Sequence, residues 1–263
     1  MVDFQCADFY TVEDLRKLVA LLRSDKGCPW DREQTHQSIR RNFLEEAYEA
    51  CEAIDTGDTA LLCEELGDVL TQVIFHARIE EEVGRFSLDD VADVTCKKLI
   101  FRHPHIFGDS EVQNADQVML AWDELKRKEK QHDTIAASMD AVAKSLPAAW
   151  RAEKVQEKAK KVGFDWPDTE GALDKLHEEI QEFKDAVGNQ AKMEEELGDL
   201  LFSVVNIARL SGIDPESALH KTSDKFIRRF AYLEQRAADL GRSLEDMSLD
   251  EMEALYTEGK NRL

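Results

Sequence analysis

The second half of the chain carries two pairs of acidic residues whose spacing suits cation binding. Glu179 and Glu182 are three residues apart, and so are Glu196 and Asp199. Residues three apart lie on the same face of a helix, and the short connection at 188–190 predicts that the two helices pack as antiparallel neighbours. Four carboxylates would then converge, and their mutual repulsion calls for a positive charge between them. All-oxygen ligands favour a hard cation, Mg²⁺ or else Mn²⁺.

The first half of the chain repeats this arrangement of acidic residues. An ordinary solvated acidic face would explain any single pair of glutamates at this spacing. Two observations favour a binding site instead. A nearly apolar run follows each aspartate, so the acids lie where a helix enters the core. A glycine, Gly67 or Gly198, interrupts each helix at the same place, although a glycine inside a helix costs about 1 kcal/mol relative to alanine. The four acids of the first half are Glu46, Glu49, Glu65 and Asp68.

Three basic residues of the second half share one helix face at spacings of three and four. Fixed cations opposite a metal could hold a triphosphate and stabilise charge on the leaving group, whereas surface ion pairing is the simpler interpretation of such a face. The first half keeps Lys98 and Arg102 but has Phe101 where the second half has Arg228. Phosphate binding is therefore expected to be weaker in the first half. The basic residues of the second half are Lys225, Arg228 and Arg229.

Two other kinds of site fit the sequence poorly. A di-iron carboxylate site in a helical bundle needs two Glu-x-x-His motifs on facing helices. Glu33-Gln-Thr-His36 has this spacing, and the second of the two expected helical domains has no counterpart. The sequence also contains no G-x-x-x-x-G-K-[ST] motif, which excludes a P-loop enzyme. A magnesium site that handles phosphate is the favoured interpretation, because magnesium keeps several waters and commonly holds substrate phosphates.

The net charge of the chain limits the kinds of molecule that it can bind. The chain has 263 residues, of which 55 are acidic and 34 are basic, so its formal net charge is −21. Binding to nucleic acid or to an anionic membrane needs a basic surface, and no apolar stretch approaches the ~18 residues of a membrane span. Five cysteines without a CxxC motif suit a reducing compartment rather than a disulfide framework. Because no signal peptide is recognisable, we expect a cytoplasmic protein without nucleic-acid or membrane partners.

Helical periodicity runs through the chain and alternating strand patterns are missing, which predicts an all-α fold. Five prolines and 12 glycines are few breakers, and the prolines stand where the apolar periodicity breaks. Residues 108–142 have the weakest pattern for a core and are interpreted as the junction between two halves. The expected helices are 11–24, 37–55, 58–83, 87–101, 114–131, 143–161, 170–187, 190–211, 215–240 and 247–260.

Four sequence blocks occur in the same order in both halves, which indicates an internal duplication of one helical-bundle unit. The clearest pair is E-E-L-G-D, at 64–68 and again at 195–199. We expect an N-terminal helical domain at 1–131, a linker at 132–145 and a C-terminal helical domain at 146–263. The other matching blocks are 44–49 with 177–182, 27–31 with 163–167, and 98–103 with 225–230.

These motifs together resemble the MazG family of all-helical nucleoside triphosphate pyrophosphohydrolases, and the tandem layout resembles its two-domain members. The resemblance covers nearly the whole chain and includes Gly27-Cys-Pro-Trp-Asp31, Arg102-His-Pro-His105 and Val162-Gly-Phe-Asp-Trp166. It implies that water attacks the α-phosphorus, so that a nucleoside triphosphate becomes a monophosphate and diphosphate. It also implies a magnesium cofactor, broad tolerance of ribo- and deoxynucleotides, a housekeeping role in the nucleotide pool, and a homodimer with the active site between helices.

The resemblance also assigns roles to residues of the second half. Lys225 and Arg229 match phosphate-binding positions, and Tyr256 stands where an aromatic residue lies near the base. Glu178 is expected to orient or deprotonate the attacking water. The residues that match the metal ligands of the family are Glu179, Glu182, Glu196 and Asp199. Further residues that line the nucleotide site in the family are Lys175, Lys192 and Glu195.

The resemblance leaves the role of the first half open. In this family the second domain often carries the activity while the first supports assembly. Here the first half keeps all four acids, which argues against an inert copy, whereas Phe101 weakens its phosphate binding. A hypothesis of another class is a regulatory nucleotide-binding protein with little or no turnover.

Overall fold

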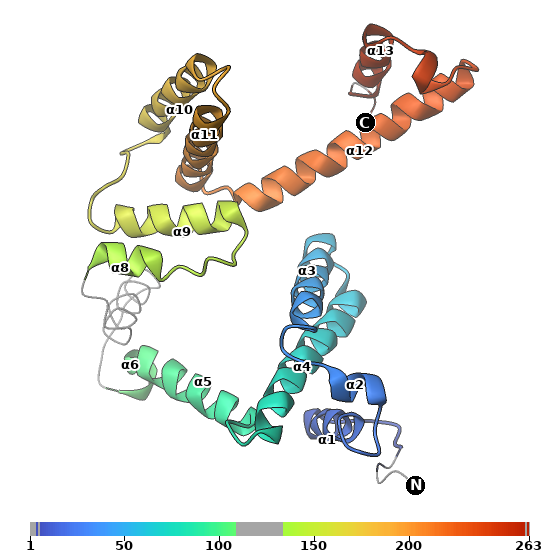
Figure 1. Cartoon of the computed structure of the whole chain (residues 1–263), viewed down its shortest axis with the longest axis vertical. Helices are drawn as coiled ribbons and strands as arrows, with labels where there is room; N and C mark the ends of the chain where they lie inside the picture. The colour runs from blue at the N-terminus through green and yellow to red at the C-terminus, as the bar shows by residue number, and fades with distance from the viewer. Residues whose placement is uncertain (1–3, 5, 109–133, 261, 263) are drawn as a thin grey trace. The chain divides into compact units, whose positions relative to one another are not determined.

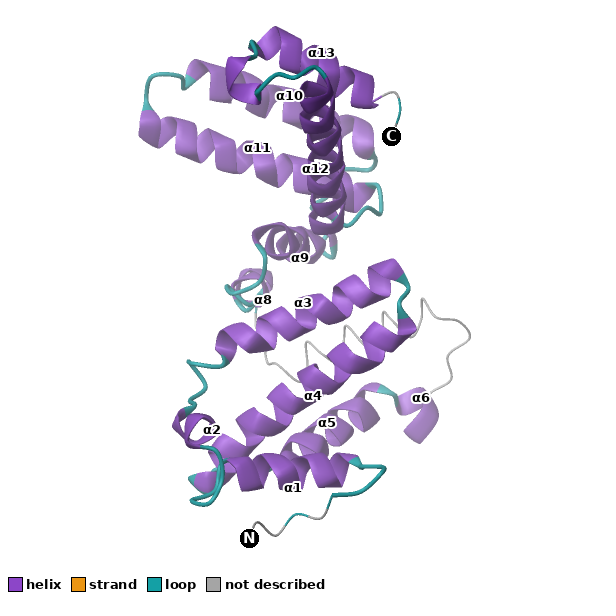
Figure 2. Cartoon of the chain, turned by 90° about the vertical axis from the view of Figure 1, so that its right-hand side faces the viewer, coloured by secondary structure: helices purple, strands orange, loops and turns teal. Residues whose placement is uncertain are grey.

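The computed structural model describes residue 4, residues 6–108, residues 134–260 and residue 262. The chain divides into two compact units, Met1–Glu129 and Lys130–Leu263. Every regular element in the described ranges is a helix (Figure 2). The prediction of an all-α chain built from two tandem units is therefore confirmed. No helix among the described residues is long and apolar enough to cross a membrane.

Unit 1 is built around an antiparallel hairpin of α3 and α4, whose helices lie side by side (Figure 1). Gly57 ends α3 in the left-handed region at φ 70°, where glycine has no steric penalty. The next residue, Asp58, caps α4 by accepting hydrogen bonds from the amides of Ala60 and Leu61. The helices of unit 1 are α1 (Val12–Leu22), α2 (Pro29–Glu33), α3 (Arg40–Thr56), α4 (Thr59–Glu82), α5 (Leu88–Arg102) and α6 (Pro104–Phe107).

Unit 2 repeats the hairpin with α10 and α11. Gly188, at φ 100°, reverses the chain after α10, and Asn189 caps α11 by accepting from the amide of Lys192. Helix α9 packs on α11, and the long α12 contacts α13, α9 and α11. The elements of unit 2 are α8 (Ile135–Asp140), α9 (Ala148–Lys160), α10 (Thr169–Asp185), α11 (Gln190–Leu210), α12 (Pro215–Asp239), the 3₁₀ turn η1 (Leu244–Asp246) and α13 (Leu249–Lys260).

The expected helices that fall in the described ranges agree with the structure to within a few residues at most ends. The expected helix at 143–161 begins later, at Ala148, directly after Pro147. Within 132–145, the expected linker, Ile135–Asp140 forms α8, which packs on α9. The six residues of α8 are too few to show a helical period. The short helices α2 and α6 were missed for the same reason. The expected helix at 114–131 lies outside the described residues.

A histidine pair lies beside the core of unit 1. The Nδ1 atoms of His36 and His76 are 2.7 Å apart, and Nε2 of His36 lies 2.6 Å from Oε1 of the buried Glu80. Arg85 also pairs with Glu80, at 3.2 Å. Burial and the neighbouring His36 lower the pKa of His76, so the folded chain disfavours protonation of this imidazole.

Acidification is expected to destabilise unit 1 through His76. The unfolded chain takes up a proton at His76 below its ordinary pKa of 6.5, whereas the folded chain resists it. The free energy of unfolding therefore falls as the pH falls from 7.5 to 5.5, and His76→Gln should flatten that dependence. Thermal unfolding at stepped pH measures it, with His220→Gln, an exposed histidine on α12, as the control. An unchanged slope in His76→Gln would contradict the assignment.

Candidate active site

The α10–α11 hairpin brings acidic residues of unit 2 to one point. Glu179, Glu196 and Asp199 each offer a carboxylate oxygen, and these atoms lie within 4.8 Å of one another. Glu179 is only 5% exposed and Glu196 only 8%. Buried carboxylates are costly unless a positive charge accompanies them. This acidic cluster is therefore unlike a solvated acidic face.

The charges of the same cluster act on the fourth expected acid, Glu182. Its carboxylate is outside the closest group, but partial desolvation and the negative charges of Glu196 and Glu179 raise its pKa. Glu196 lies on α11, so Glu182 is close enough to that helix for the two charges to interact. All four acids of the second half are brought into one electrostatic neighbourhood.

Two lysines partly offset the charge of the acidic cluster. Nζ of Lys175 lies 2.9 Å from Glu179 and 3.0 Å from Glu178, and these contacts raise its pKa. Nζ of Lys192 lies 3.8 Å from Glu196. Lys175 and Lys192, which were expected to line the nucleotide site, thus lie beside the acids. Glu195 is exposed on α11.

One carboxylate oxygen of the acidic cluster has no partner. Oε2 of Glu179 is buried and accepts no hydrogen bond from any described residue. A buried carboxylate oxygen without a donor is destabilising, and a bound cation would satisfy it. The donor set is made of carboxylate oxygens alone, which suits Mg²⁺ or Mn²⁺ rather than a softer metal. The residues therefore fit a hard divalent cation.

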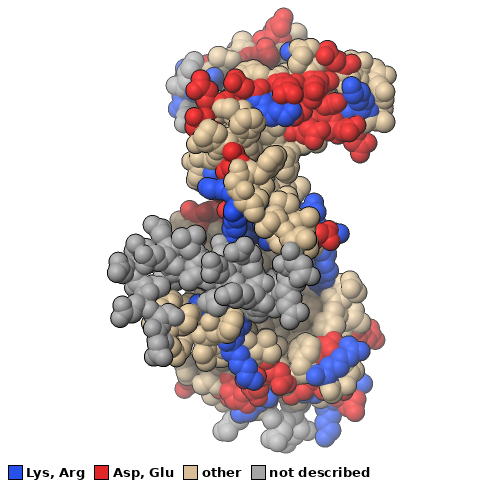
Figure 3. Space-filling model, turned by 90° about the vertical axis from the view of Figure 1, so that its left-hand side faces the viewer, with Lys and Arg blue, Asp and Glu red and all other residues tan. Residues whose placement is uncertain are grey.

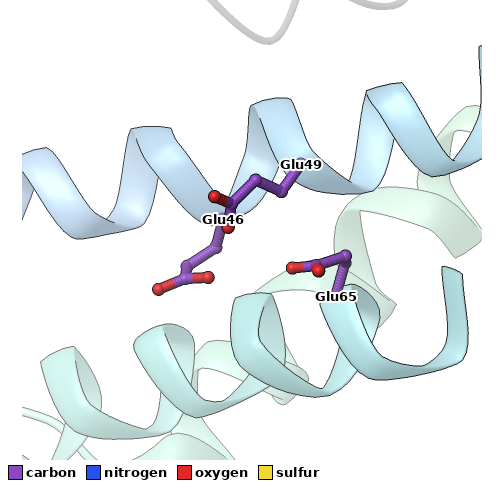
Figure 4. A group of neighbouring side chains, drawn as sticks. All are labelled: Glu46, Glu49 and Glu65. Atoms are coloured by element: carbon purple, nitrogen blue, oxygen red, sulfur yellow. The ribbon is translucent and has the colours of Figure 1, made fainter. Parts of the chain in front are cut away.

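Unit 1 forms the corresponding acidic group from α3 and α4. Glu46 and Glu49 extend from α3 toward Glu65 on α4, with carboxylate oxygens within 4.8 Å of one another (Figure 4). Burial raises the pKa of Glu46, and the charges of Asp68, Glu49 and Glu65 add to the effect. Asp68 thus lies close enough to act on the group. Among the described residues, none of the three clustered glutamates forms an ion pair.

The two acidic groups differ in their basic neighbours. Counting from the shared motifs, Asn42 stands where unit 2 has Lys175, and Leu61 stands where it has Lys192. The expected cations Lys98 and Arg102 lie on α5, which packs on α4. Unit 1 therefore keeps the carboxylates and lacks the lysines that flank them in unit 2.

The basic residues of α12 are not joined to the acidic cluster. Within the described part of the chain, no ion pair or hydrogen bond connects Lys225, Arg228 or Arg229 with a carboxylate of α10 or α11. The guanidinium of Arg229 instead lies 6.0 Å from the ring of Tyr256 on α13, and that ring is 5.6 Å from Phe226. The structure thus brings Arg229 and Tyr256 together.

Sequence reasoning missed a cavity of about 630 Å³ beside the acidic cluster. Its wall contains the charged residues Lys175, Glu179 and Asp199 and the aromatic residues Phe164 and Trp166. The G-F-D-W block that supplies both aromatic rings was visible in the sequence. Nothing in its spacing showed that α9, α10 and α11 would leave space against it.

Comparison with known proteins identifies the family. Two segments, 34–107 and 168–232, match the MazG nucleotide pyrophosphohydrolase domain. The chain belongs to this family. Each matched segment contains one acidic group, and the second also contains the basic residues of α12. Tyr256 and the G-F-D-W block lie outside both segments.

Relatives of similar length share both units. The chain is 42% identical over 248 residues to the nucleoside triphosphate pyrophosphohydrolase/pyrophosphatase MazG of Thermotoga maritima, covering 94% of this chain and 95% of that protein. It is 40% identical over 256 residues to the nucleoside triphosphate pyrophosphohydrolase of Escherichia coli K12, covering 95% and 97%. The predicted family and its tandem layout are confirmed.

Proposed function

We propose that the chain is a magnesium-dependent nucleoside triphosphate pyrophosphohydrolase that releases a nucleoside monophosphate and diphosphate. As a MazG protein it is a hydrolase that acts on phosphoric anhydrides, and the relatives named above support nucleoside triphosphates as its substrates. The observation that carries the proposal is the buried acidic cluster of unit 2, with the unpartnered Oε2 of Glu179. A closed structural site would leave no room for substrate, whereas this one opens on a cavity.

Each charged group around the acidic cluster has a role in the proposed reaction. Glu179, Glu196 and Asp199 would hold the cation, with Glu182 completing the set. A cation held there would supply positive charge against the phosphate oxygens and would make water a stronger nucleophile. Glu178 takes a proton from the attacking water while the water oxygen bonds to the α-phosphorus. The bond between the α-phosphorus and the bridging oxygen then breaks. The electron pair of the broken bond leaves with diphosphate.

Lysines beside the acidic cluster would steady the departing phosphates. Lys175 bridges Glu178 and Glu179, and its charge is available to a phosphate once a cation faces Glu179. Lys192 lies on the other helix, next to Glu196. Positive charge fixed near the leaving group lowers the barrier because negative charge accumulates there.

The basic residues of α12 are proposed to bind the β- and γ-phosphates in a homodimer. Among the described residues they form no ion pair or hydrogen bond with the acidic cluster of the same chain. Apolar side chains along α11 and α12 are exposed, which supports a protein interface there. Sedimentation equilibrium should give twice the chain mass of 30.0 kDa, and a monomer at micromolar concentration would contradict the proposal. The exposed apolar residues are Leu197, Leu201, Phe202, Phe226, Ile227 and Phe230.

Broad tolerance of ribo- and deoxynucleotides, a housekeeping role in the nucleotide pool and a cytoplasmic location complete the proposal. They rest on the family resemblance and on the charge of the chain. Acidic side chains gather on one face of unit 2 with a few basic ones among them (Figure 3), and the net charge is −21. Nucleic acid is accordingly not proposed as a partner.

Product analysis in labelled water tests the reaction. The chain is incubated with each ribo- and deoxynucleoside triphosphate, Mg²⁺ and water enriched in ¹⁸O. We expect equal amounts of monophosphate and diphosphate, with the label in the monophosphate because water attacks the α-phosphorus. Label in diphosphate, or release of orthophosphate, would overturn the reaction. Binding without any turnover would instead establish a regulatory nucleotide-binding protein.

A further inference from the structure

We propose that the cavity between α9, α10 and α11 holds the base of the nucleotide, and that Gln156 and Asn206 read the hydrogen-bonding edge of that base. The inference rests on the proposed function and adds to it a base-recognition site. The cavity measures about 630 Å³ and lies entirely within unit 2. Its size is in the range of small-molecule sites, which are largely apolar with a few polar groups.

The cavity joins the acidic cluster to an aromatic surface. Glu179 and Asp199 belong to both the cluster and the cavity wall, so a nucleotide whose phosphates lie at the cluster has its base within reach of the cavity. Trp166 and Phe164 supply rings on which a base can stack. The Trp166 ring packs on the backbone of Gly171, where a Cβ would lie 2.7 Å from the ring. This close approach fixes the ring beside α10.

Two amides in the cavity wall have fixed orientations. Nε2 of Gln156 donates to the carbonyl of Phe202 at 2.9 Å, so its Oε1 is the group left to accept. Oδ1 of Asn206 accepts from Nη2 of Arg209 at 2.7 Å and from Nε at 3.2 Å, so its Nδ2 is the group left to donate. A guanidinium only donates and a carbonyl only accepts, and therefore neither amide can be reversed without losing its contact.

The side-chain oxygen of Gln156 accepts no hydrogen bond from the described residues. The residue is only 7% exposed, and its Oε1 is buried without a hydrogen-bond partner among the described residues. A buried acceptor without a donor is destabilising. Phosphate oxygens cannot donate, whereas every nucleobase presents N–H donors beside acceptors on its edge. An acceptor from Gln156 and a donor from Asn206 therefore match a base rather than a phosphate.

Unit 1 lacks this pair. Phe75 stands seven residues after Asp68, as Asn206 stands seven residues after Asp199. Phe75 belongs to the hydrophobic core with Val19, so the position that could donate to a base is occupied by packing. Base recognition by this pair is confined to unit 2. Gln156 and Asn206 would also give the base contacts other than Tyr256, whose ring packs on α12.

Calorimetric titration with non-hydrolysable analogues of the four ribonucleoside triphosphates tests the inference without depending on turnover. Asn206→Asp keeps an oxygen for Arg209 and replaces the free donor by an acceptor, and Gln156→Met removes the free acceptor at similar volume. We expect each to weaken at least one nucleotide about tenfold relative to another, so that the ranking of bases changes. Inorganic tripolyphosphate, which has no base, should bind all forms within twofold.

Asn189→Asp is the matched control, because it makes the same chemical change at an exposed cap outside the cavity, where aspartate caps equally well. It should leave the ranking of bases unaltered. Equal weakening of all four nucleotides and of tripolyphosphate in both cavity variants, or no weakening, overturns the inference. A changed ranking in Tyr256→Ala alone would also overturn it. A changed ranking in the cavity variants with no diphosphate release by the wild type would instead retain the inference and reject the proposed activity.

Discussion

Glu196→Gln is expected to lower kcat/KM for diphosphate release more than about 100-fold, because removing even an outer-shell partner of a metal ligand costs 10- to 100-fold. The substitution keeps the size of the side chain and removes its charge. Glu196 is nearly buried and lies within the acidic cluster that faces the cavity. Glu65→Gln is the matched change in unit 1 and is expected to lower kcat/KM less than about tenfold.

Magnesium binding provides a second measurement of the same variant. A ligand that binds only the folded state stabilises it, by about 2.7 kcal/mol at 100 times its Kd. Wild-type protein should therefore melt at a higher temperature in saturating Mg²⁺, and Glu196→Gln should lose most of that rise. An equal loss of activity in Glu65→Gln and Glu196→Gln would show that the two units share the reaction. No effect of Mg²⁺ on wild-type melting would argue against a cation at these carboxylates.

Glu196→Gln is expected to lower activity more than Glu65→Gln because the two acidic groups have different neighbours. The acids themselves are the same in both units. Lys175 and Lys192 flank the carboxylates of unit 2, and unit 1 has Asn42 and Leu61 at those positions. A triphosphate brings several negative charges to a site that is already acidic, so cations beyond the metal decide whether it binds. Duplication preserved the carboxylates in both units, and the groups that would hold phosphate diverged.

Sequence periodicity was sufficient to predict the two hairpins and their converging carboxylates, because the spacing of Glu179 and Glu182 fixes a helix face and a short loop fixes the neighbour. It was insufficient for contacts between elements distant in the sequence. The face shared by Lys225 and Arg229 was visible, but the spacing does not say which helix α12 packs against. Gln156 was missed for the same reason, since its role depends on where α9 meets α11.

Short elements escaped prediction for a related physical reason. Helix α8 has six residues, and its position depends on packing against α9 rather than on a periodic pattern of its own. Its Ser138 is buried and accepts a hydrogen bond from Lys158 at 3.3 Å. A short segment of mostly small residues has the composition of a linker, and the contact with α9 gives it a defined place in unit 2.

A buried ion pair holds the cavity wall. The guanidinium of Arg209 is 5% exposed and donates to both carboxylate oxygens of Asp165, which is 15% exposed, as well as to Asn206. Burial opposes ionisation of Asp165, but the hydrogen bonds and the charge of Arg209 outweigh it and lower the pKa of that carboxyl. The pair connects α11 with the G-F-D-W block.

Arg209→Met is expected to lower the free energy of unfolding of unit 2 by about 3–5 kcal/mol, because it leaves the Asp165 carboxylate buried without its charged partner. Urea denaturation measures it. Arg209→Met combined with Asp165→Asn should recover much of the loss, since the uncompensated charge is then gone. Arg16→Met, which breaks the more exposed pair with Asp89, should cost less than about 1 kcal/mol.

The pH dependence of the Arg209→Met variant separates charge from packing. In the wild type, Asp165 has a lowered pKa, so its contribution to stability is present above the ordinary value of 3.8 and is lost only as the pH falls through the lower folded value. Without Arg209, burial favours the protonated carboxyl, and its folded pKa rises above the unfolded one. The deficit of the variant should therefore shrink as the pH falls from 7 toward 4. A deficit that stays constant over this range would mean that Arg209 stabilises unit 2 through the packing of its aliphatic stem, and not by neutralising Asp165.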